Sequence, residues 1–149
     1  MALGRPQRRG DQGLRPCRPA SRTAGGVSPI GDEPPVLLGS NEGPNAVELL
    51  LQALGFCYAV GYVYNAAARG IDISELRYEI EGDLDLHSFL GLVGPRAGFT
   101  AIRATSWVKS PNATTEQLEE LCQYVQDTSP VRDCLANPIP VTTDLVVVA

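Results

Sequence analysis

The chain has 149 residues, a formal net charge of −5 and a hydrophobic content of 44%. That length allows one domain with a real core. The charge is uneven, because residues 1–30 carry six arginines and one acid for +5, and the remaining residues carry −10. An acidic body speaks against nucleic-acid binding by the domain, so we expect no nucleic-acid partner.

Residues 1–30 have the composition of a disordered tail, with five glycines, four prolines and no apolar period. The glycines and prolines would break the amphipathic helix that an organelle transit peptide needs. We therefore expect a disordered Arg/Gly/Pro-rich tail at 1–30 and a domain at 31–149. The abrupt change near Gly31 also raises the hypothesis that the tail comes from a misassigned start or a frame change.

A stretch without charge, Leu49–Ala68, dominates the domain. Asn45 and Glu48 have the spacing of a capping box, and Gly70 is placed to end the helix, which predicts a helix at Ala46–Arg69. A helix that is apolar all round is buried in a membrane or in a core. Its tyrosines would fall in the hydrocarbon centre rather than at the interfaces of a bilayer. We therefore favour burial of this helix in a protein core, and we expect no membrane partner.

Small residues recur every four positions on this helix, at Ala53, Cys57 and Gly61. Such a strip lets another backbone approach closely, so this face is expected to meet a second helix. Cys57 lies at its centre, where it is either a reactive thiol or a small packing residue.

The four cysteines include no CxxC pair, and His87 is the only histidine. We expect no disulfide framework, no metal and no cofactor, and a reducing cytoplasm as the compartment. Cys122 fits an apolar helical stripe and is expected in the core. His87 has no visible partner.

The other elements are taken in chain order. We expect a strand at Pro35–Gly39, a strand at Leu76–Leu86, a strand at Phe99–Val108, a helix from Thr114 to Ser129, a helical turn at Val131–Ala136 and a last strand at Val141–Val148. The two middle strands would pair antiparallel, with Gly82 as a candidate bulge. This order indicates an α+β fold. One strand face carries acids, at Glu79, Glu81, Asp83 and Asp85, and a solvated face is favoured over a cation site.

An ordered set of motifs carries a resemblance over residues 31–148. The set is Gly43-Pro44, Glu48–Cys57, Arg69-Gly70-Ile71, Glu81–Asp85, Ser129–Asp133 and Asn137–Val141. It resembles the OsmC/Ohr family. The resemblance implies an OsmC-like fold: an intertwined homodimer with two long central helices packed on antiparallel sheets. It also implies a thiol-dependent peroxidase that reduces organic hydroperoxides.

When the family's functional residues are matched one by one to positions of this sequence, only some of them have a counterpart. Cys57 aligns with the cysteine that attacks the peroxide, and Ser129 stands where the family has a resolving cysteine. Glu48 lies one residue from the position of the family's glutamate, which is held here by Val47, so Glu48 is either catalytic or a helix cap. The family's arginine and N-terminal strands have no counterpart. Cys134 is a further candidate for the resolving thiol.

Three hypotheses remain open. The first is a hydroperoxide-reducing enzyme that uses Cys57, with Glu48 as a second catalytic candidate and an external thiol as the resolving partner. The second is a non-catalytic homodimer that binds an apolar ligand, with Cys57 structural. The third is a shortened derivative that folds poorly, because the missing strands leave a sheet edge uncovered.

Overall fold

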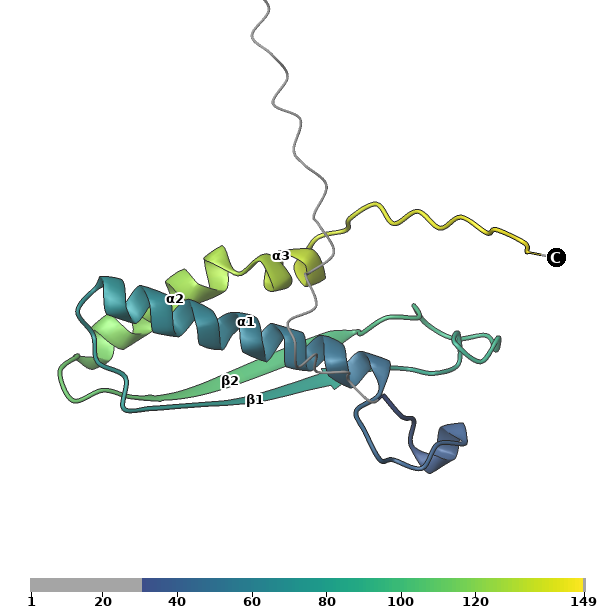
Figure 1. The fold of residues 1–149 in the computed structure, drawn as a ribbon, viewed down its shortest axis with the longest axis horizontal. Coiled ribbons are helices and arrows are strands. Elements are labelled where there is room, and N and C mark those ends of the chain that lie inside the picture. The colour runs from purple at the N-terminus through teal and green to yellow at the C-terminus, as the bar shows by residue number, and fades with distance from the viewer. Residues whose placement is uncertain (1–30, 149) are drawn as a thin grey trace, which may run out of the picture. The chain divides into compact units, whose positions relative to one another are not determined.

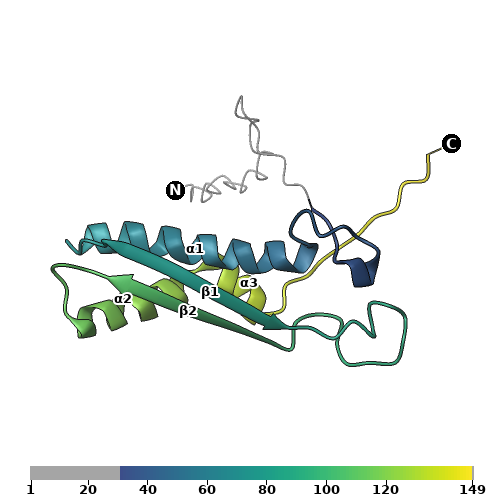
Figure 2. The same cartoon turned by 90° about the horizontal axis from the view of Figure 1, so that it is seen from below.

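The computed structural model describes residues 31–148, so the tail predicted at 1–30 lies outside the described residues. Three α-helices lie on one face of a β-hairpin (Figures 1 and 2). In chain order the elements are η1 (Pro35–Leu37), α1 (Ala46–Ala68), β1 (Glu75–Asp83), β2 (Ala101–Lys109), α2 (Thr115–Thr128) and α3 (Pro130–Ala136). This mixture of helices with a small antiparallel sheet confirms the α+β prediction.

The predicted start of α1 at Ala46 is confirmed, and the helix ends at Ala68, one residue before the predicted end. The Asn45 side chain accepts a hydrogen bond from the Glu48 amide at 2.9 Å, and the Glu48 carboxylate accepts one from the Asn45 amide at 2.9 Å. At the other end Gly70 has a φ of 67°, the left-handed conformation that glycine adopts without strain. The Ile71 amide then donates back to the Ala66 carbonyl at 2.9 Å.

The hairpin confirms the predicted antiparallel pair. Its register runs without interruption from Glu75 opposite Lys109 to Asp83 opposite Ala101. The bulge expected at Gly82 is therefore wrong, because Gly82 pairs directly with Ile102. This glycine instead makes room for an aromatic ring, since a side chain added there would collide with Phe99. The close approach of a ring, rather than an irregular ladder, explains the glycine.

Two predicted strands are wrong. The segment expected at Pro35–Gly39 contains the single turn η1, because Pro34 and Pro35 have no amide to donate to a sheet and Leu38 has a φ of 67°. The segment at Val141–Val148 is extended but pairs with no strand of the described chain. After α3 it runs away from the hairpin (Figure 1), which leaves it out of reach of both sheet edges.

The core lies between α1, α2 and the inner face of the hairpin. Its buried residues are Leu54, Tyr58, Tyr62, Ala66, Ile71, Leu121 and Val125. The prediction that α1 is buried all round is wrong for the single chain, because α2 and the hairpin cover only one side of it. On the uncovered side Phe56 is 70% exposed and Tyr64 is 73% exposed.

Within the described residues, α1 is the one helix long and apolar enough to cross a membrane by length and composition. The central helices of soluble proteins also meet that criterion. The inward position of Tyr58 and Tyr62 agrees with the expected core role of this helix.

Candidate active site

The strip of small residues on α1 meets a second helix, as predicted. A Cβ added at Gly61 would lie 3.0 Å from Cγ1 of Val125 on α2, which is tighter than an ordinary contact. Because Gly61 has no side chain, the backbone of α1 can approach α2 closely. One turn earlier on the same strip, Cys57 faces the junction between α2 and α3, where its thiol meets Ser129.

Ser129 is the N-cap of α3, and this role fixes its hydroxyl group. Its oxygen accepts a hydrogen bond from the Arg132 amide at 3.2 Å, as an N-cap serine does. The hydroxyl then donates to the sulfur of Cys57 at 3.1 Å. Ser129 is only 5% exposed and is the one buried polar residue of the described chain. The helix cap at Ser129, which depends on local sequence, therefore directs the serine hydroxyl at the Cys57 sulfur as a hydrogen-bond donor.

This geometry brings together two positions that the family resemblance singled out. Cys57 and Ser129 are 72 residues apart in sequence and in contact in the fold. Cys57 is half-buried, so part of its surface stays open to a reactant. A hydroxyl donor can hold a thiolate, or an oxidised sulfur, in a fixed orientation. It cannot form a disulfide, so this site contains one redox-active atom.

The structure does not bring Glu48 to the thiol. Its carboxylate is held by the Asn45 amide in the capping box. Nine residues separate Glu48 from Cys57, which corresponds to about 13.5 Å along the helix axis. Within the described chain, Glu48 therefore acts as a helix cap.

The other two cysteines of the described chain lie apart from this contact, and all three are free thiols. Cys122 packs against the core as expected, and its sulfur accepts a hydrogen bond from the Gln126 amide group at 3.2 Å. Cys134 is exposed on α3. The role of Cys134 as a resolving thiol stays a prediction.

A tyrosine cluster under α1 was not recognised in the sequence. The Tyr78 ring lies 6.0 Å from the Tyr58 ring and 5.9 Å from the Tyr62 ring. Burial raises the pKa of Tyr62 to about 12, with a further contribution from the neighbouring Cys122 thiol and an opposing one from the hydrogen bond with Ser106 at 3.3 Å. Burial also raises the pKa of Tyr78, whose hydroxyl is buried without a hydrogen-bond partner in the described chain. The signal was available, because Tyr58 and Tyr62 are one helical turn apart and Tyr78 lies on the inward face of its strand.

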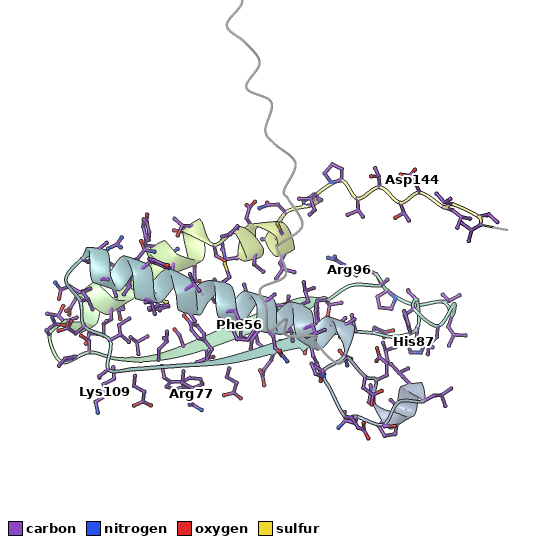
Figure 3. The ribbon with its side chains drawn as sticks, viewed as in Figure 1. Phe56, Arg77, His87, Arg96, Lys109 and Asp144 are labelled. Carbon is purple, nitrogen blue, oxygen red and sulfur yellow. The ribbon has the colours of Figure 1, made fainter. Side chains whose placement is uncertain are left out.

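The acidic strand face is a solvated surface, as favoured from the sequence. Arg103 on β2 pairs with Asp83 at 2.6 Å and with Glu81 at 3.4 Å. No group of three His, Cys, Asp or Glu side chains within residues 31–148 could hold a metal ion. Figure 3 shows Arg77 and Lys109 pointing away from the helices on this outer face.

His87 does have a partner, contrary to expectation. Its Nδ1 lies 2.7 Å from the Asp85 carboxylate. The Asp85 carboxylate also accepts a hydrogen bond from the His87 amide, and these contacts lower the pKa of Asp85. The pair lies in the exposed loop after β1, away from Cys57, and Figure 3 shows His87 there.

Comparison with solved structures shows the same fold. The chain superposes on an OsmC-like protein from Mycoplasma pneumoniae with a TM-score of 0.57 at 22% identity, covering 65% of each chain. An OsmC-like protein of unknown function from Vibrio cholerae gives a TM-score of 0.56 at 13% identity, covering 74% of this chain and 73% of that one. The chain thus spans just under two thirds of the length of the Mycoplasma protein.

A third similar structure bears a functional name. It is an organic hydroperoxide resistance protein OsmC from Legionella pneumophila, also described as a predicted redox protein and regulator of sulfide bond formation. The TM-score is 0.55 at 15% identity, and the match covers 75% of this chain and 77% of that one. No curated protein sequence matches the chain. The family model described as OsmC-like protein matches residues 39–144. The chain therefore belongs to the OsmC-like family.

Proposed function

We propose that this protein reduces organic hydroperoxides through the thiol of Cys57. The observation that carries the proposal is the 3.1 Å hydrogen bond from the buried Ser129 hydroxyl to the Cys57 sulfur. It fixes the sulfur at a half-open site and supplies a donor that can hold the thiolate, the form that attacks a peroxide. The name of the similar Legionella protein supports the same substrate class.

The proposed reaction has three steps. The Cys57 thiolate attacks the terminal oxygen of the hydroperoxide, the O–O bond breaks, and a proton converts the departing alkoxide to an alcohol. The sulfur is oxidised to a sulfenic acid and the peroxide is reduced. An external thiol then attacks the sulfenic sulfur and releases water. A second thiol breaks the mixed disulfide, which restores Cys57 and leaves the oxidised disulfide of the reductant.

The requirement for an external thiol follows from the serine at position 129. Because serine has no thiol, the sulfenic acid at Cys57 cannot be resolved by its hydrogen-bond partner. A low-molecular-mass thiol or a small redox protein fills this role in the proposal, which places the protein in a reducing cytoplasm. Glu48 serves as the cap of α1 and takes no step in the reaction.

A second copy of the chain is part of the proposal. The uncovered side of α1 is a continuous apolar strip, formed by Phe56, Val60, Val63 and Tyr64, each at least 55% exposed. These positions follow helical spacing on one face. A surface strip of this kind is typical of an interface, and a central helix paired with its own copy would bury it. The proposed assembly is a homodimer.

The experiment is peroxide consumption by the purified protein with dithiothreitol as reductant and cumene hydroperoxide as substrate. We expect turnover by the wild type, by Cys122→Ser and by Cys134→Ser. We expect none by Cys57→Ser, which differs by one atom at the reacting position. Turnover that survives Cys57→Ser, or that requires Cys134, would contradict the proposal. Sedimentation of the wild type beside Val60→Asp tests the dimer, and a wild-type monomer would contradict it.

A structural role for Cys57 is the second candidate. It is favoured by the position of Cys57 one turn from the tight contact between Gly61 and Val125. In that case the protein is a non-catalytic dimer, and Cys57→Ala reduces stability without changing any reactivity toward peroxide. The same consumption assay separates the two, because a folded wild type without turnover leaves only this candidate.

A further inference from the structure

A cleft of about 630 Å³ lies beside the contact between Cys57 and Ser129. It opens between the inner face of the hairpin, α1 and the α2–α3 segment, and its volume is in the range of about 300–1,000 Å³ that is typical of small-molecule sites. Tyr58, which follows Cys57 on α1, lines this cleft. So does Arg132, whose amide donates to the Ser129 hydroxyl. Residues that adjoin the sulfur therefore form part of the wall.

The Tyr58 hydroxyl is an unpartnered polar group in this wall. Tyr58 is only 6% exposed, and its ring lies 6.0 Å from the Tyr78 ring in the core. Its hydroxyl forms no hydrogen bond within residues 31–148. In that part of the chain, Tyr78 has the one unpartnered side-chain oxygen that is sealed from solvent, so the Tyr58 oxygen keeps accessible surface. Because Tyr58 lines the cleft, a molecule in the cleft can reach this hydroxyl.

The surroundings of Tyr58 suit a proton donor. Burial raises the pKa of its hydroxyl above the ordinary value for tyrosine, which keeps the proton on the phenol at neutral pH. The positive charge of Arg132 lowers the same pKa, so it favours the tyrosinate that remains after the proton has left. Cys57 also contributes to the rise, which places the Tyr58 hydroxyl within electrostatic range of the reacting sulfur.

The proposed reduction of a hydroperoxide requires such a donor beyond the sulfur. Attack by the Cys57 thiolate on the terminal oxygen releases an alkoxide, and an alkoxide is too basic to leave readily without a proton. The departing oxygen lies on the side of the attacked oxygen that is opposite to the sulfur. The Ser129 hydroxyl is directed at the sulfur itself, so it does not face the departing oxygen. The Tyr58 hydroxyl is accessible in the adjoining cleft.

We propose that the Tyr58 hydroxyl donates the proton to the departing alkoxide, an inference that rests on the proposed peroxidase function. As the O–O bond breaks, its electron pair passes to the departing oxygen, which takes the Tyr58 proton and leaves as an alcohol. The terminal oxygen keeps its own hydrogen and forms the sulfenic acid on Cys57. The tyrosinate at Tyr58 regains a proton from water. The sulfur is oxidised and the peroxide is reduced, so atoms and electrons balance.

The test compares two oxidants in single turnovers of Tyr58→Phe, with formation of the Cys57 sulfenic acid as the readout. Cumene hydroperoxide and perbenzoic acid both carry a phenyl ring, but the first releases an alkoxide and the second a carboxylate, which needs no proton. We expect Tyr58→Phe to slow the reaction with cumene hydroperoxide about 100-fold and to leave that with perbenzoic acid unchanged. The matched control is Tyr78→Phe, which deletes the sealed hydroxyl of the adjacent ring and should react with both oxidants as the wild type does.

Two further measurements separate proton donation from a structural role. The urea midpoint of Tyr58→Phe should equal that of the wild type, because the deleted hydroxyl forms no hydrogen bond in the described chain. Alkylation of Cys57 by iodoacetamide should be equally fast in both proteins, because the variant leaves the thiol itself unchanged. Equal slowing with both oxidants, or no slowing with cumene hydroperoxide, would overturn proton donation by Tyr58 and leave the peroxidase function standing. A wild type that forms no sulfenic acid with either oxidant would overturn both.

Discussion

Replacing Ser129 by cysteine should convert the hydroxyl–thiol contact into a disulfide. The two side-chain atoms are already 3.1 Å apart, so a small movement brings two sulfurs to the bonding distance of about 2.05 Å. The bond would close a loop between positions 72 residues apart. In the chain-entropy description such a loop stabilises the folded state by about 4 kcal/mol.

The assay compares Ser129→Cys with and without reductant. Oxidation should lower the intact mass by about 2 Da, peptide mapping should join residues 57 and 129, and the urea midpoint should rise by about 2 M at a slope of about 2 kcal/mol per M. The control is the double variant Cys57→Ser/Ser129→Cys, whose urea midpoint should be the same with and without reductant. A folded, oxidised variant that keeps both thiols free, or that pairs position 129 with Cys122 or Cys134, would refute the geometry of the site.

Three further predictions concern stability. Gly61→Val should cost about 1–3 kcal/mol in urea unfolding, because its side chain would collide with Val125. The exposed control Ala67→Val should cost only about 0.5 kcal/mol, and equal losses would contradict the close packing. Asn45→Ala should cost about 1 kcal/mol through the lost cap of α1, and an unchanged midpoint would contradict it. The free energy of unfolding should fall as pH rises from 10 to about 12, because the folded state keeps the Tyr62 proton over that window while the unfolded state loses it. Tyr62→Phe should weaken this dependence, and a decline of the same size in that variant would contradict the assignment.

Elements with local signals were predicted well from the sequence. The capping box that begins α1 uses residues three positions apart and forms as expected, and a second box of the same kind begins α2. The left-handed Gly70 and the alternating pattern of β1 are equally local. Of the two strands that failed, the one at Pro35–Gly39 is prevented by its own prolines and the left-handed Leu38, whereas the last one depends on a neighbouring strand. The segment at Val141–Val148 has the composition of a strand, but no edge of the described chain lies beside it.

The candidate site was predictable only in part. The resemblance placed Cys57 and Ser129 at related positions, but a hydroxyl directed at the sulfur depends on how α3 begins beside α1. The buried Tyr78 hydroxyl was missed, because its isolation depends on the packing of two other tyrosines.

The central claim is that the sulfur of Cys57 reacts with hydroperoxides. The most direct measurement is trapping of its sulfenic acid: the protein is treated with one equivalent of cumene hydroperoxide, a dimedone-type probe is added, and the adduct is mapped by mass spectrometry. We predict rapid labelling of Cys57, with Cys122 and Cys134 unlabelled. A folded protein with Cys57 unlabelled, while its peroxide remains unconsumed, would contradict the account and leave this thiol as a packing residue.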